Sequence, residues 1–122
     1  MEEWQQVLAQ MLKEELRETG LSQRKLASKI GVSHVQLGRW LEGQDQPSMD
    51  SQIKLAAYFS LPETPFSQLI RGEIGERELR VAQITERFRA LSADELKGLD
   101  RVLQATLRMW GIDIEQEHGE RA

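Results

Sequence analysis

The chain contains no cysteine and only two histidines, His34 and His118. Without thiols it can form neither a disulfide nor a thiolate zinc site. No HExxH motif and no glycine-rich phosphate loop is present, so neither an enzyme nor a cofactor is expected. No run of eighteen apolar residues occurs, and the N-terminus has no basic segment typical of a signal peptide. We therefore expect a cytoplasmic protein without a membrane span.

The composition of 122 residues, 39% hydrophobic and 30% charged, fits one compact domain with extensions. The net charge of −4 is unevenly distributed. Residues 21–43 hold four basic side chains and one acidic one, whereas residues 1–20 and 111–122 are acidic. Salt screens exposed charges beyond about 8 Å, so a local basic face can attract phosphates despite an acidic total. The alternative is that these basic side chains form an ordinary solvated surface.

Apolar residues recur at three- and four-residue steps along most of the chain, which predicts an all-α protein. A long first helix should end at Gly20, and two short helices should follow at 23–30 and 34–42. Pro47 and Ser48 should open a fourth helix with four inward residues: Ile53, Leu55, Ala56 and Phe59. Thr64 is expected to cap a fifth helix, with Pro65 at its first position.

Two further amphipathic helices are predicted after Gly72, over residues 76–90 and 92–111. The second begins with the capping-box pattern Ser-Ala-Asp-Glu at residues 92–95. The expected organisation is therefore a domain over residues 1–72, a two-helix module over residues 76–111, and an acidic flexible tail over residues 112–122.

The most specific pattern in the chain is the segment from Gln23 to Glu42, QRKLASKIGVSHVQLGRWLE. Counted from Gln23, seven positions hold the residue types that a helix-turn-helix requires. These are Leu26, Ala27, Ile30, Gly31, Val32, Leu37 and Trp40. The apolar residues can form a small shared core, alanine lets the helices approach, and Gly31 can adopt the positive φ of the turn. Ser22 and Ser33 are expected to cap the two helices.

From about Leu12 to Leu61 the chain resembles the phage repressor and Cro family of five-helix DNA-binding domains. The residues that carry the resemblance are Gly20-Leu21-Ser22-Gln23, Leu26-Ala27, Gly31-Val32-Ser33, Leu37, Gly43, Pro47-Ser48 and Leu55-Ala56. The resemblance implies a five-helix domain whose third helix, residues 33–42 here, enters the major groove of double-stranded DNA. A helical hairpin with chance matches, or a helix-turn-helix that contacts only protein, remains the alternative.

The resemblance assigns base reading to His34, Val35 and Arg39, with Gln36 at the edge of this set. The arginine fork suits guanine, histidine can donate to an acceptor, and valine can contact a thymine methyl. Gly38 allows close approach of the backbone. Arg39 could instead contact only phosphate, and His34 could merely flank the helix cap.

Gln23, Ser33 and Lys29 are the predicted phosphate contacts. The chain departs from relatives in two places. The loop at 44–46 is Gln-Asp-Gln where relatives often place a basic residue, and Leu16 and Leu41 stand where many have a buried arginine and glutamate. Because replacing both charges avoids an unpaired buried ion, the two leucines are predicted to pack together.

The two C-terminal helices are too apolar to remain without a partner. We expect them to form a homodimer interface, because paired half-sites require two domains at a fixed separation of about 34 Å. The predicted interface residues are Phe88, Leu91, Leu99, Leu103 and Trp110. Packing on the same chain remains an alternative. The expected function is a sequence-specific transcriptional repressor. The alternatives are an antitoxin that binds DNA and a toxin, and a helix-turn-helix protein used only for contact with another protein, such as a different regulator.

Overall fold

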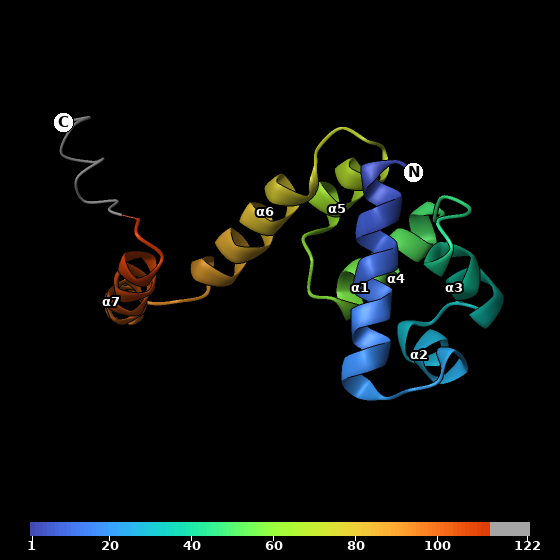
Figure 1. The fold of residues 1–122 in the computed structure, drawn as a ribbon, viewed down its shortest axis with the longest axis horizontal. Coiled ribbons are helices and arrows are strands. Elements are labelled where there is room, and N and C mark those ends of the chain that lie inside the picture. Colours follow the sequence, from blue (N-terminus) through green and yellow to red (C-terminus); the bar gives the residue numbers. More distant parts are fainter. Residues whose placement is uncertain (113–122) are drawn as a thin grey trace. The chain divides into compact units, whose positions relative to one another are not determined.

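A computed structural model describes residues 1–112 of the chain. These residues form seven α-helices and no strand, which confirms the predicted all-α fold (Figure 1). The helices are α1 (Glu3–Thr19), α2 (Gln23–Ile30), α3 (His34–Leu41), α4 (Met49–Tyr58), α5 (Glu63–Ile70), α6 (Glu76–Arg89) and α7 (Ala93–Met109). The chain divides into two compact units, Met1–Glu86 and a second that begins at Arg87.

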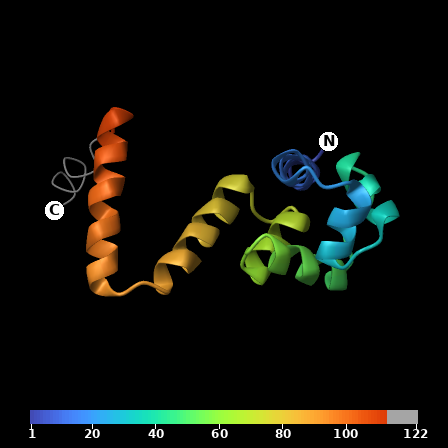
Figure 2. The same ribbon diagram turned by 90° about the horizontal axis from the view of Figure 1, so that it is seen from below.

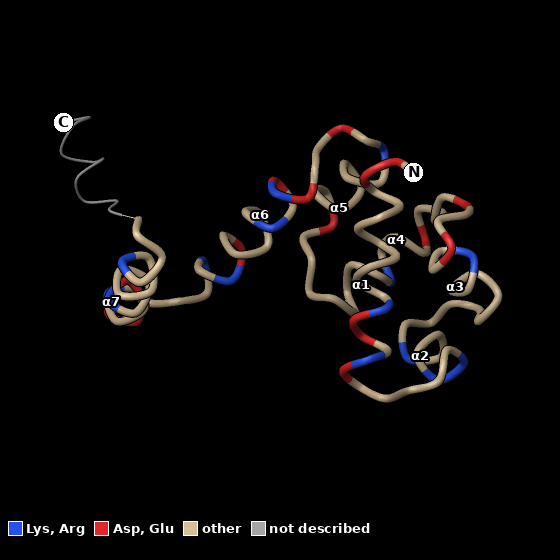
Figure 3. Tube along the Cα trace, viewed as in Figure 1, with Lys and Arg blue, Asp and Glu red and all other residues tan. Residues whose placement is uncertain are grey.

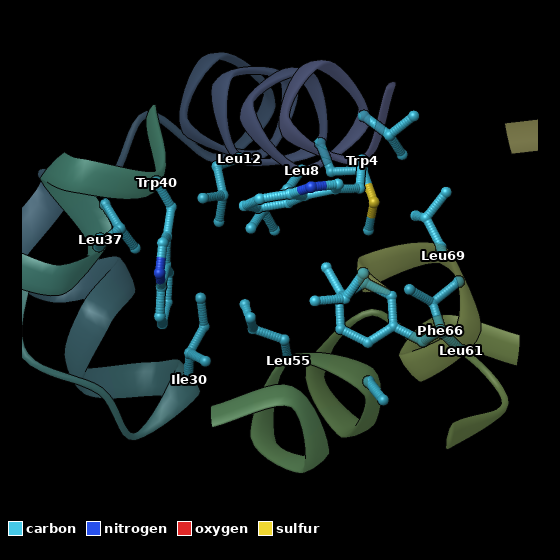
Figure 4. Close-up of a cluster of buried hydrophobic side chains, with 14 of the residues drawn as sticks. Trp4, Leu8, Leu12, Ile30, Leu37, Trp40, Leu55, Leu61, Phe66 and Leu69 are labelled. Carbon is cyan, nitrogen blue, oxygen red and sulfur yellow. The ribbon is translucent and has the colours of Figure 1, made fainter. Parts of the chain in front are cut away.

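The core of the first unit is built from the inward faces of α1 to α5, which gather around a common centre (Figure 2). Leu8 and Leu12 of α1 face Trp40 of α3 and Leu55 of α4 across this centre (Figure 4). Phe66 of α5 is also fully buried here. Burial of so many large apolar side chains holds the short helices, which would be only marginally stable alone.

The start of α6 packs onto the same core. Leu79 is fully buried, and the backbone N–H of Glu76 donates to Glu3 Oε2 of α1 at 2.7 Å. Gln83 is buried one turn later, and its Nε2 donates to the carbonyl oxygen of Phe59 at 3.4 Å. The first unit therefore extends past residue 72, where the sequence placed the end of the domain.

Two local expectations were wrong. Ile53 does not point into the core but is 44% exposed, while Leu55 and Ala56 are buried as predicted. The fifth helix begins at Glu63 with Pro62 as its N-cap residue, so Thr64 is not the cap and Pro65 is the third helical residue. Proline is tolerated there because the first-turn N–H groups have no partner within the helix.

The helix α7 begins as the sequence predicts. Ser92 Oγ accepts from the backbone N–H of Glu95 at 3.2 Å, and the Glu95 side chain accepts from the N–H of Ser92 at 2.9 Å. The hydrogen bond that the Ser92 backbone donates to the carboxylate lowers the pKa of Glu95, and the Ser92 hydroxyl adds to this effect. No residue of α7 is buried, although Leu99 and Leu103 are large and apolar, and Trp110 at its C-terminal cap is also exposed.

The predicted acidic tail falls almost entirely outside the described residues, which end at Ile112. Among the seven helices described, none has the length and apolar character that a membrane crossing requires.

Candidate nucleic-acid interface

The turn between α2 and α3 has the caps that the sequence predicts. Ser22 Oγ accepts from the N–H of Lys25, and Ser33 Oγ accepts from the N–H of Gln36 at 3.1 Å. Gly31 ends α2 with a φ of +95°, a conformation that residues with a Cβ adopt only with strain. Local capping thus fixes where both helices of the motif begin and how the chain turns between them.

The inner face of the motif is buried as predicted. Leu26, Ala27 and Ile30 of α2 lie in the core with Leu37 and Trp40 of α3. Ala27 is only 1% exposed, so this position has no room for a larger side chain. Core packing therefore holds the inner side of α3.

The outer face of α3 is exposed. His34, Val35, Gln36 and Arg39 all lie on the surface, and the large apolar side chain of Val35 is 54% exposed. Gln36 has a structural task as well, because its Oε1 accepts from the N–H of Ser33 at 3.4 Å. Three of the four predicted base-reading side chains are thus open to a ligand, and the fourth also completes the capping box.

The start of α2 lies beside this exposed face. Gln23, the first residue of α2, is exposed, and its Oε1 lies 3.8 Å from the point that a Cβ on Gly38 would occupy. An alanine at position 38 would therefore meet only an ordinary contact within the chain. Lys29 and Ser33, the other two predicted phosphate contacts, are also exposed.

Basic residues lie on both helices of the motif (Figure 3). The structure adds one that the sequence analysis did not single out, Lys54 of α4. Its Cδ lies 3.5 Å from the position of a Cβ on Gly31, and its Nζ pairs with Asp50 Oδ2 at 3.0 Å. The Asp-Lys spacing of four predicts the ion pair, but only the fold brings Lys54 to the turn.

Arg39 has a partner that the sequence analysis also missed. Its Nη1 donates to Asp45 Oδ2 at 2.9 Å, across the loop that follows α3. In the sequence, Asp45 is only one of three residues in a loop without basic side chains. Asp45 has a backbone φ of +49°, which the sequence does not reveal.

Comparison with protein families supplies the class of this domain. Residues 12–66 match a helix-turn-helix family model of the phage repressor and Cro type. Residues 12–66 are therefore similar to this family, and a helix-turn-helix domain of this type suggests a DNA-binding transcription regulator. Comparisons with curated proteins and with solved structures gave no match. The match includes all of α2, α3 and α4, and so contains every residue of the exposed face described above.

Proposed function

We propose that this protein is a sequence-specific transcriptional repressor that binds double-stranded DNA as a homodimer. The observation that carries the proposal is the face of α3 formed by His34, Val35 and Arg39, exposed on a helix whose opposite side is locked into the core by Leu37 and Trp40. Binding sites built on rigid helices keep their geometry, and an α-helix fits the major groove. The repressor role rests on the resemblance to phage repressors.

Each exposed side chain of α3 has chemistry that a base edge can satisfy. The guanidinium of Arg39 can donate to O6 and N7 of one guanine, which discriminates by about 1 to 3 kcal/mol. The imidazole of His34 can donate to a groove acceptor, and the methyl groups of Val35 can contact a thymine methyl. Gly38 lies between these residues and lets the helix backbone approach the base edges closely.

Phosphate contacts would come from the rim of this face. Gln23 lies at the N-terminus of α2, where unpaired backbone N–H groups also favour an anion. Lys29 and Ser33 are exposed on the same motif and can contact the DNA backbone. These residues would set the position of α3 on the duplex without selecting its sequence.

The second unit supplies the proposed dimer contact. Leu99 and Leu103 lie four residues apart on one face of α7 and are 38% and 42% exposed. Three more large apolar residues of the second unit are exposed or half-buried: Phe88, Leu91 and Trp110. Large apolar side chains left exposed on a monomer are typical of an association site. We propose a second copy of the chain as its occupant, because reading two half-sites requires two domains at a fixed separation.

The dimer is tested by changing α7 alone. Leu99→Glu with Leu103→Glu places two charges in the proposed interface, and Arg101→Glu places one on the opposite face of the helix. Sedimentation velocity should give a dimer for the wild type and for Arg101→Glu, and a monomer for the leucine variant. A wild type that remains monomeric at high concentration would contradict the dimer and leave the apolar face to a different protein, such as a toxin or another regulator.

The reading face is tested by comparing Arg39→Ala with Gln23→Ala on DNA enriched by the wild type from a random pool. Loss of Arg39 should relax the preference at one base pair in each half-site. Loss of Gln23 should weaken binding to enriched and random DNA alike, with an almost unchanged salt slope because glutamine displaces no counterion. If Arg39→Ala weakened binding to all DNA sequences equally and gave a shallower salt slope, Arg39 would be a phosphate contact. Base reading would then depend on His34, Val35 or DNA shape.

A further inference from the structure

The loop after α3 places a carboxylate against the proposed base-reading arginine. The single contact between Arg39 Nη1 and Asp45 Oδ2 measures 2.9 Å, and the two side chains are 55% and 54% exposed. This contact occupies one of the five N–H donors of the guanidinium. The edge formed by Nε and Nη2 is left to donate to a guanine.

The backbone on both sides of Asp45 is attached to three helices. The attachments are the hydrogen bonds from Gln44 N to Arg39 O at 2.8 Å, from Gln5 Nε2 to Gly43 O at 2.7 Å, and from Gln46 Nε2 to Ile70 O at 2.8 Å. These bonds connect the loop to α3, α1 and α5 respectively. These bonds hold the chain on either side of Asp45 against the helices of the first unit, which places Asp45 next to Arg39.

The backbone alone does not require an aspartate here. Asp45 has a φ of +49°, which glycine and asparagine adopt at least as readily. A negative charge beside a DNA-binding face also repels phosphates, so it opposes binding of any DNA. An acidic residue at this point is best explained by what it does to Arg39.

We propose that Asp45 is a positioning residue that orders the Arg39 guanidinium for base reading. This inference rests on the proposed function. The ion pair restricts the rotamers of a flexible side chain before DNA arrives, so less conformational freedom is lost on binding. It also offsets the attraction of Arg39 for phosphates, so that the arginine contributes more to base choice than to non-specific affinity.

The inference is tested with Asp45→Asn, which suits the same backbone and removes the charge, and with Asp45→Gly, which removes the side chain. Each is made in the full-length wild type and in Arg39→Ala, and unfolding curves check that the fold is kept. In the free protein, NMR of the Arg39 guanidinium should show faster rotation about the Nε–Cζ bond in both variants. On the enriched DNA, preference for the base pair read by Arg39 should fall about two- to tenfold, as expected for losing the order of one side chain. Neither variant should change base preference in the Arg39→Ala background.

Three results would overturn the inference while leaving the proposed function in place. In the Asp45 variants, these are an unchanged base preference, an equal increase in affinity for enriched and random DNA in both backgrounds, and unchanged rotation of the Arg39 guanidinium in the free protein. The second would show that Asp45 only repels phosphates. A wild type that enriches no DNA sequence would instead refute the proposed function, and this inference with it.

Discussion

Replacing Leu79 with alanine tests whether the start of α6 belongs to the DNA-binding domain. Leu79 is fully buried among the side chains of α1 to α5, so truncation leaves a cavity that the rigid core cannot close. Leucine-to-alanine changes at such sites cost about 2 to 5 kcal/mol, and we expect ~3 kcal/mol here. A domain of this size is stable by only about 5 to 15 kcal/mol, so the effect should be large.

Urea unfolding followed by tryptophan fluorescence measures this loss, because Trp4 and Trp40 are both buried in the affected core. Val81→Ala is the matched control on the same helix, since Val81 is 50% exposed. It should be neutral or slightly stabilising, because alanine is the better helix former. A Leu79→Ala loss as small as that of the control would refute the packing of α6 on the core. By the same reasoning, a chain ending at Gly72 should unfold far more easily than one ending at Arg89.

Three further predictions concern other parts of the chain. Gly38→Ala and Gly98→Ala should each stabilise the free protein by up to about 1 kcal/mol through helix propensity. Electrophoretic mobility shifts should show that only Gly38→Ala weakens DNA binding. Equal effects of the two changes on DNA binding would show that Gly38 lies outside the DNA interface. Leu41→Glu should destabilise strongly and Leu16→Arg should restore part of the loss, whereas additive effects in a urea-unfolding cycle would show that these two half-buried side chains do not meet. The hydrogen bond that Tyr58 Oη donates to the Glu15 carboxylate raises the pKa of Tyr58 to about 12. The stability that this hydrogen bond contributes is therefore fully present below pH 10 and is lost as the pH rises from 10 to 12. The wild type should lose more free energy of unfolding than Tyr58→Phe across that range. An equal pH dependence of the two proteins would contradict this.

The parts of the fold that depend on local chemistry were predictable from the sequence. A serine cap such as Ser33 and a positive φ such as that of Gly31 are determined by neighbouring residues, so their positions follow from the pattern. Burial of Leu26 and Trp40 follows from helical periodicity for the same reason. These features define the recognition helix, which is why its exposed face could be anticipated.

The parts that depend on tertiary contacts were not predictable. Periodicity gives an apolar face to the helix that contains Leu79, but it does not say which surface that face will cover. A proline such as Pro65 fits at several positions of a first turn, so the start of α5 was misplaced. The contact between Asp45 and Arg39 lies in a loop with a positive φ at a non-glycine residue and with hydrogen bonds to three helices, and the sequence pattern reveals neither feature.

Selection from a random double-stranded DNA pool by the full-length wild type tests the central claim most directly. A homodimer that reads bases with α3 should enrich two inverted half-sites whose centres lie about one helical turn, roughly 10 base pairs, or a multiple of it apart. The Leu99→Glu and Leu103→Glu variant should lose this paired motif while keeping weak preference for a single half-site. A pool that shows no enriched sequence after selection by the wild type would contradict the proposed function.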